Sequence, residues 1–262
     1  MALKEITMSP TSFRTRVRQR ERLVGTFVKT AAYQVVEVLG TSGLDFVVVD
    51  AEHAPFDRSA IDVCMLAARA ADLPALVRVP NPAAETMLSV LDVGAAGVLV
   101  PHARTAQGVR EVIASTRYRS GTRGFSNSSR AGRYGRVGMA ELLDRADLEA
   151  TVICQIEDRD AVENIEQLAA IDEVDCLFIG RADLAVSYGL TEVSHPVIDE
   201  AVRRVCIACS EVRKAVGIFV TDARDCVRYE QLGASLFVVG SDQSMLYAQA
   251  MSVAAAVQRK VA

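Results

Sequence analysis

The residues that follow one apolar run could act as an acid–base pair. Residues 44–49 read Leu-Asp-Phe-Val-Val-Val, and Asp50, Glu52 and His53 come directly after them, before Pro55 ends regular structure. A carboxylate and an imidazole can transfer protons where a rigid strand fixes their geometry. The sequence has only three histidines in 262 residues, so a histidine at this position makes the segment a candidate active site.

Other side chains able to do chemistry also follow apolar runs. They are Arg78, His102, Arg104, Gln155, Glu157, Arg181 and Asp183. Arg78 lies between Val77 and Val79, so its guanidinium needs an anionic partner or a polar cavity. Glu157 and Asp183 follow successive runs and could share one divalent cation. Mg²⁺ takes only one or two protein carboxylates and leaves room for substrate oxygens, and Mn²⁺ and Co²⁺ accept the same ligands.

Each of these residues also has a structural interpretation. Glu157 could cap the helix that follows it, Asp183 could be a turn residue, and Arg78 could bridge core carboxylates without touching a substrate. His102 could line a site or satisfy a loop, whereas His195 precedes a proline and is predicted to cap a helix. The positions of these residues favour a role in catalysis, because all the candidates except His195 follow strands whose ends would meet on one face.

The elements that position these residues alternate between two patterns. Apolar, β-rich runs predict eight strands, at 22–28, 44–49, 75–79, 97–100, 151–156, 175–179, 216–220 and 235–239. Amphipathic patterns between them predict helices at 58–71, 82–93, 105–116, 161–171, 197–215 and 222–232. This alternation favours an α/β fold, a (β/α)8 TIM barrel that forms one domain over residues 1–262. An open doubly wound sheet is the alternative, but no glycine-rich turn follows Val28.

Two segments depart from this pattern. Residues 117–138 contain five glycines, six arginines and four serines. A solvated surface loop is one interpretation, but we expect a binding loop at the carboxyl ends of the strands, because long loops in compact domains often bind ligands and acidic substrates need cations. The basic segment 14–22 is predicted to be a solvated helix face.

Composition limits the class of protein. The chain is 50% hydrophobic but only 5% aromatic, which suits parallel strands with aliphatic cores. A net charge of −4 gives no reason to expect nucleic acid. The six cysteines lie mostly in apolar runs, and Cys206 and Cys209 share a helical pattern, so we predict buried thiols. No signal segment or membrane-spanning run is visible, which predicts a cytoplasmic protein without a membrane partner.

Six segments together resemble the HpcH/HpaI aldolase family. They are residues 50–55 (DAEHAP), 77–80 (VRVP), 100–106 (VPHARTA), 123–132 (RGFS…RAG), 155–157 (QIE) and 180–184 (GRADL). The resemblance spans about residues 22–245. It implies a barrel of the phosphoenolpyruvate/pyruvate-binding type and a class II, metal-dependent pyruvate aldolase, related to the 2,4-dihydroxyhept-2-ene-1,7-dioate and 2-keto-3-deoxy-sugar-acid aldolases.

The resemblance also implies residue roles. Glu157 and Asp183 would hold Mg²⁺, Mn²⁺ or Co²⁺, Arg78 would contact the pyruvate oxygen, and His53 with Asp50 would act as the base. The substrate-binding set would be Arg78, His102, Gln155, Gly180, Arg181 and Ala182. Arg181 departs from the family pattern, which commonly has proline there, so a restraint on the carboxylate-binding turn is lost and a charge is added.

The reaction implied is reversible cleavage of a 4-hydroxy-2-oxo acid into pyruvate, or a related 2-oxo acid, and an aldehyde through a metal-bound enolate. A Schiff-base aldolase is disfavoured, because the only lysine at a strand end is Lys29. Alternatives on the same scaffold are an oxaloacetate decarboxylase, a CoA-ester lyase and a non-catalytic binder of oxo acids. Resemblance further implies a homo-oligomer, a hexamer, with a C-terminal helix at about 241–258 that packs on a neighbouring subunit or closes its own barrel.

Overall fold

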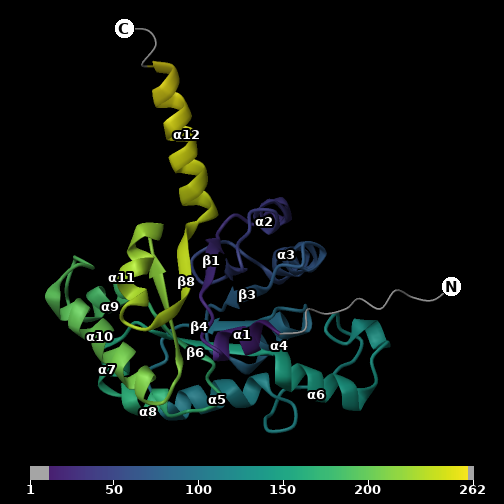
Figure 1. Ribbon diagram of the computed structural model, residues 1–262. Helices are drawn as coiled ribbons and strands as arrows, with labels where there is room; N and C mark the ends of the chain where they lie inside the picture. The colour runs from purple at the N-terminus through teal and green to yellow at the C-terminus, as the bar shows by residue number, and fades with distance from the viewer. Residues whose placement is uncertain (1–11, 259–262) are drawn as a thin grey trace.

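Eight parallel strands close into a barrel in chain order, each beside the next, and the first beside the last (Figure 1). The structure, a computed structural model, describes residues 12–258. The strands are β1 Leu23–Val28, β2 Phe46–Asp50, β3 Ala75–Arg78, β4 Gly97–Val100, β5 Thr151–Ile156, β6 Cys176–Ile179, β7 Ala215–Val220 and β8 Ala234–Ser241. The predicted barrel is confirmed, and closure by the β1–β8 pair rules out the open sheet.

Helices follow the strands. They are α1 Phe13–Arg18, α2 Tyr33–Gly40, α3 Arg58–Ala70, α4 Ala84–Asp92, α5 Ala106–Thr116, α6 Met139–Glu149, α7 Arg159–Glu163, α8 Ile165–Ala169, α9 Arg181–Ser187, α10 Pro196–Glu211, α11 Cys226–Glu230 and α12 Asp242–Gln258, with short 3-10 turns η1 Arg133–Gly135 and η2 Ala223–Asp225. The predicted helix 161–171 is broken at Asn164, and 197–215 ends early because Arg213 has a left-handed φ of 56°. His195 caps α10 as predicted, since its Nδ1 accepts from the Val197 amide at 3.2 Å.

The barrel has an inner and an outer apolar core. Large inward side chains such as Phe46, Leu76 and Phe178 fill the lumen, and Phe13 and Val17 of α1 close one end of it. The Phe13 and Phe46 rings lie 5.3 Å apart. Alternate strand residues pack outward against the helices, as expected for parallel strands buried on both faces.

The basic segment 14–22 is only in part the solvated helix face that we predicted, since Arg18, Arg20 and Arg22 are exposed. Arg14 and Arg18 of α1 bind the fully buried carboxylate of Asp175, with N–O distances of 2.8 and 3.2 Å. Phe13 and Val17 point into the barrel. The helix therefore closes one end of the lumen, and two of its arginines pair with a buried carboxylate.

The prediction for residues 117–138 was also wrong in its location. The loop leaves the end of α5, so it lies at the amino-terminal ends of the strands. Arg123 pairs with Asp92 at the end of α4, at 2.9 Å, and the Ala131 amide donates to the Asp92 carbonyl. A loop that follows a helix cannot share the face where the strands end.

The cysteine prediction holds. All six are free and buried, and burial raises the pKa of Cys206 to about 11 and that of Cys209 to about 12. Within residues 12–258 none of the helices has the length and apolar character needed to cross a membrane.

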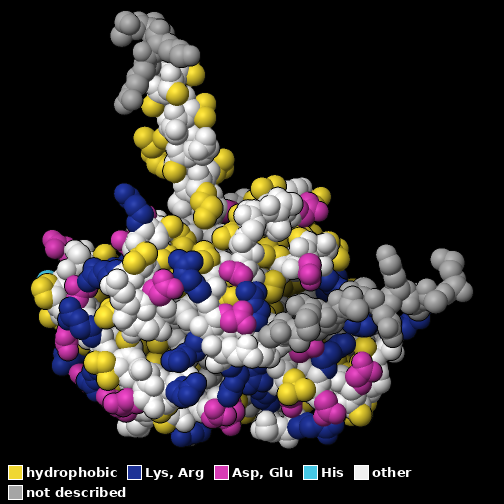
Figure 2. Space-filling model, viewed as in Figure 1, with side chains coloured by type: hydrophobic (Ala, Val, Ile, Leu, Met, Phe, Trp, Pro, Cys, Tyr) yellow, Lys and Arg dark blue, Asp and Glu magenta, His cyan; other side chains and the backbone are white. Residues whose placement is uncertain are grey.

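The last helix, α12, projects away from the barrel (Figure 1) and carries apolar side chains around its surface (Figure 2). Leu246 is 73% exposed and Tyr247 is 68% exposed. Its base is fixed, because the Asp242 carboxylate accepts from the amides of Lys29 and Thr30 at 2.7 and 3.0 Å.

Candidate active site

A buried ion pair joins the ends of two neighbouring strands. Asp50 ends β2, Arg78 ends β3, and the two residues are register partners. The guanidinium donates two hydrogen bonds to the carboxylate, at 2.9 and 2.7 Å, and Lys29 Nζ lies 3.4 Å from it. Burial opposes ionisation most strongly, but the hydrogen bonds and charge of Arg78 outweigh it and lower the pKa of Asp50. The guanidinium carbon also lies 4.5 Å from the centre of the Phe27 ring, so Arg78 is held rigidly.

Asp50 fixes the loop that carries His53 by accepting hydrogen bonds from the backbone of that loop. Its Oδ1 accepts from the amides of Glu52 and His53, at 3.3 and 3.1 Å. The imidazole itself lies near Glu52, with 3.6 Å between His53 Nε2 and Glu52 Oε2. This oxygen is buried and accepts no hydrogen bond, and it is 3.4 Å from Arg78 Nε. Asp50 therefore sets the loop, while the carboxylate next to the imidazole is that of Glu52.

Two carboxylates come from the next part of the barrel. Glu157 directly follows β5 and is 2% exposed, and Asp183 lies on the first turn of α9, after β6. Burial is the largest cause that raises the pKa of Glu157, and the negative charges of Asp183 and Glu52 add to it, whereas His102 opposes. The three carboxylates thus share one electrostatic environment. Across the described part of the chain no group of three or more His, Cys, Asp or Glu side chains forms a metal site by itself.

The surroundings of Glu157 are tightly built. Gln155 Nε2 donates to its Oε2, and the His102 amide donates to its Oε1 at 2.8 Å. Gln155 Oε1 is buried and has no hydrogen-bond partner. Gly180 faces the pair: a Cβ on it would lie 2.8 Å from Gln155 Nε2 and 3.0 Å from Glu157 Oε2. Glycine here keeps the position of a Cβ clear and so leaves a small polar space beside the pair, in which Gln155 Oε1 is an acceptor without a partner.

His102 and Arg104 sit at the edge of this space. His102 has a left-handed φ of 53°, and its Nδ1 lies 3.0 Å from Asp158 Oδ2. Arg104 binds the other oxygen of Asp158 at 2.9 Å. Partial burial opposes protonation, but Asp158 and Glu157 raise the pKa of His102. Asp158 is therefore the partner of the His102 imidazole, as in the interpretation in which this histidine satisfies a loop.

Arg181 is placed away from this polar space. Its guanidinium carbon lies 4.9 Å from the centre of the buried Tyr229 ring on α11, and its Nε has no hydrogen-bond partner. Ala182 and Asp183 complete the first, exposed turn of α9 beside Gly180. The added charge in this segment is therefore directed toward the outer helix.

The barrel brings most of the predicted residues to one face and gives contacts to two residues that had no assigned role. Lys29 binds Asp50 and Glu52 contacts both Arg78 and His53. Lys29 directly follows β1, as the sequence indicated, but its ion pair with Asp50 was not predicted. The contact of Glu52 depends on how the loop turns, and no sequence pattern reports that.

Comparison with known proteins identifies the family of the chain. The sequence profile described as HpcH/HpaI aldolase/citrate lyase matches residues 23–249. The chain belongs to the HpcH/HpaI aldolase/citrate lyase family. It is 32% identical over 242 residues to 5-keto-4-deoxy-D-glucarate aldolase of Shigella boydii serotype 18, covering 92% of this chain and 93% of that one. It is 33% identical over 235 residues to the same-named Escherichia coli protein, covering 89% and 91%.

A solved structure shares the fold over nearly its whole length. The family member from Burkholderia cenocepacia J2315 aligns with a TM-score of 0.89 at 32% identity, covering 94% of this chain and 98% of that one. The predicted family and the enzyme class, an aldolase or lyase on a pyruvate-type TIM barrel, are therefore confirmed.

Proposed function

We propose that this protein is a divalent-metal-dependent aldolase that reversibly cleaves a 4-hydroxy-2-oxo acid into pyruvate, or a related 2-oxo acid, and an aldehyde. The observation that carries the proposal is the rigid Asp50–Arg78 pair at the strand ends, on the same barrel face as Glu157, Asp183 and Gly180. The relatives named 5-keto-4-deoxy-D-glucarate aldolase support a sugar-acid substrate.

The residues fit a hard divalent cation such as Mg²⁺, Mn²⁺ or Co²⁺. Glu157 and Asp183 supply two carboxylates, and the pKa of Glu157 is raised by burial and by its acidic neighbours, so a cation there relieves their repulsion. Two protein carboxylates are what Mg²⁺ typically takes. When bound, such a cation supplies Lewis-acid stabilisation of negative charge on substrate oxygens.

The other residues have roles that follow from their positions. Arg78 is fixed by Asp50 and Phe27, so its charge is preorganised beside a developing oxyanion. The His53 imidazole is half exposed and can accept the proton of the C4 hydroxyl during cleavage. Gln155 Oε1 can accept a hydrogen bond from a hydroxyl group of the substrate, and the backbone at Gly180–Ala182, with His102 at the rim, is available to bind the 2-oxo acid. Arg181 belongs to this turn but its guanidinium lies over Tyr229, so its contribution to binding is through the backbone.

Exchange of the pyruvate methyl protons in D₂O, followed by proton NMR, tests this proposal without a choice of aldehyde. Exchange should require Mg²⁺ and stop with EDTA. Glu157→Gln and His53→Ala should each lower its rate by roughly 100-fold or more. Glu163→Gln, on the exposed face of α7, and His195→Asn, which keeps the helix cap, are the matched controls.

The outcomes separate the alternatives. Pyruvate binding without exchange under any metal would indicate a non-catalytic binder and contradict the proposal. Oxaloacetate decarboxylation that needs Glu157 but not His53, with no aldol cleavage, would indicate a decarboxylase. Cleavage of a CoA ester alone would indicate a CoA-ester lyase.

The proposed enzyme is a cytoplasmic homo-oligomer, a hexamer, of one barrel domain whose α12 packs on a second copy of the chain. This helix has 17 residues, and apolar side chains are exposed around it. An exposed apolar surface of this kind marks a site of contact with another protein. Deletion of residues 242–262 should reduce the sedimentation coefficient to that of a smaller assembly. An unchanged assembly would contradict this part of the proposal.

A further inference from the structure

A cavity lies at the opposite end of the barrel from the candidate active site. It has a volume of about 360 Å³ and is bordered by residues just before or at the starts of β3, β4 and β5, by α3, α4 and α6, and by the loop 117–138. Ala75, which begins β3, lines it, whereas Arg78, which ends β3, belongs to the active site. Its volume is that of a site for a small metabolite.

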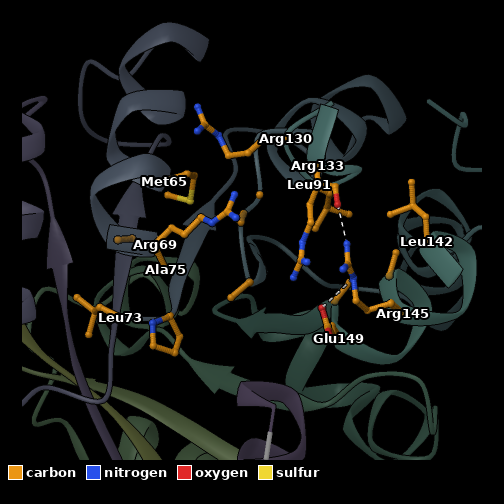
Figure 3. Close-up of a pocket in the computed structure, with 18 of the residues that line it drawn as sticks. Met65, Arg69, Leu73, Ala75, Leu91, Arg130, Arg133, Leu142, Arg145 and Glu149 are labelled. Atoms are coloured by element: carbon orange, nitrogen blue, oxygen red, sulfur yellow. Dashed lines mark hydrogen bonds and ion pairs between the residues drawn. The ribbon is translucent and has the colours of Figure 1, made fainter. Parts of the chain in front are cut away.

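Five arginines line this cavity, which we name the arginine pocket: Arg69, Arg123, Arg130, Arg133 and Arg145. Figure 3 shows Arg69 and Arg130 on one side and Arg133, Arg145 and Glu149 on the other. These arginines come from α3 and, far along the chain, from the loop 117–138 and the helix α6 that follows it. The fold therefore gathers positive charge in one concave place.

The charge in the arginine pocket is only partly neutralised. Arg69 and Arg133 form no ion pair with any residue from 12 to 258, and both are exposed to the cavity mouth. Arg123 and Arg130 bind Asp92 and Asp62 at 2.9 and 2.7 Å through Nη2.

The buried ends of these two arginines are unsatisfied. Nε of Arg123 and Nε of Arg130 are both buried and have no hydrogen-bond partner. The whole Arg123 residue is only 7% exposed. A buried guanidinium N–H without an acceptor is costly, so an acceptor brought by a ligand would be favourable.

The acidic residues in the wall do not match this charge. They are Asp72, which is exposed, and Glu149, whose carboxylate lies 3.8 Å from Arg145 Nε. Apolar side chains, among them Leu73, Leu91 and Leu142, form the rest of the lining. A ligand that suits these walls has anionic groups for the guanidinium forks and a carbon frame for the apolar surface.

We propose that the arginine pocket binds a small organic polyanion with two or more carboxylate or phosphate groups, separately from the catalytic site. The site is independent of the proposed aldolase reaction, because none of its lining residues belongs to the candidate active site. It lies at the amino-terminal end of the barrel, away from the strand ends that carry the candidate active site.

Isothermal titration calorimetry with the full-length protein tests the proposal. Metal is first removed with EDTA, so that neither probe binds through a cation, and citrate and inorganic pyrophosphate are titrated separately. Citrate stands for carboxylate ligands and pyrophosphate for phosphate ligands, so the tighter one identifies the source. The variant Arg69→Gln/Arg133→Gln should weaken binding about tenfold or more, since each lost charge-assisted contact is strong. Glu149→Gln should tighten it, because a repelling charge is removed.

Three controls make the result decisive. Arg110→Gln removes an exposed arginine of α5 outside the pocket and should leave the affinity unchanged. Arg78→Gln should also leave it unchanged, and a loss there would place the anion in the active site and overturn the proposal. If neither citrate nor pyrophosphate binds, or if the double variant binds them as tightly as the wild type, the proposal is overturned as well. Sedimentation of the double variant is measured in parallel, and a smaller assembly without anion binding would assign the pocket to a subunit interface.

Discussion

Replacement of Asp50 with asparagine isolates the energy of the ion pair that builds the active site. The substitution keeps the shape of the side chain and removes its charge. The Arg78 guanidinium, whose side chain is 7% exposed, then keeps only one carboxylate partner, Glu52 at 3.4 Å. Breaking a buried pair typically costs about 3–5 kcal/mol. Because Glu52 compensates in part, we expect the lower end, about 3 kcal/mol.

Urea denaturation followed by far-UV circular dichroism measures this change. For a protein of this size, a loss of about 3 kcal/mol corresponds to a midpoint lower by roughly 1 M urea and to a melting temperature lower by about 6–12 °C. Wild type and variant are compared at one protein concentration, since association also stabilises the folded state.

A double-mutant cycle identifies the cause of the loss. Arg78→Met in the Asp50→Asn background removes the stranded charge, so the double variant should be more stable than the sum of the single losses by about 1 kcal/mol or more. The control is Glu200→Gln, which breaks the exposed pair with Arg203 and should cost less than about 1 kcal/mol. Additive losses, or an Asp50→Asn shift no larger than this control, would refute the reasoning.

Three further predictions follow from the site and the core. The pKa of Asp50 is lowered in the folded state, so the stability that its charge contributes is present above its unfolded pKa of about 3.9 and is lost as pH falls through the lower folded value. The difference in urea midpoint between wild type and Asp50→Asn should therefore be large at pH 7 and should disappear in acid. Gly180→Ala should weaken Mn²⁺ binding about tenfold, measured by electron paramagnetic resonance, because its Cβ would lie 2.8 Å from the amide that holds Glu157, and unchanged affinity would show that the space is not needed. The six buried thiols should react with Ellman's reagent only on unfolding, and rapid reaction of the native protein would contradict their burial.

The barrel could be predicted from sequence because its signals are local and repeated. Each strand is a short aliphatic run, and the side chains that follow these runs, such as Asp50, Glu157 and Asp183, fall on one face once the strands are parallel. Three helices were missed, α2, α6 and α9. None of them begins with a side-chain cap, so their starts carry no signal.

What was not predicted depends on contacts between distant segments. The loop 117–138 was assigned to the wrong face because its composition suggested binding, whereas its position after α5 sets its location. In the sequence, Phe13 appears only as a residue at the start of a basic helix. Its burial in the barrel depends on the ion pair that Arg14 of the same helix forms with Asp175, far along the chain. Likewise, whether Asp50 or Glu52 lies next to the His53 imidazole is decided by loop geometry.

The anchoring of α12 has a mechanical consequence. Asp242, the first residue of the helix, holds the amides of Lys29 and Thr30, and the Lys29 ammonium lies 3.4 Å from Asp50. A helix of 17 residues is about 25 Å long, so it is a lever whose fixed end is linked through Lys29 to Asp50 of the candidate active site. Force on its far end, whether from a neighbouring subunit or from a tethered fusion partner, is transmitted to the Lys29 backbone. A fusion at the C-terminus therefore loads the candidate active site directly, whereas α1 lies at the opposite end of the barrel.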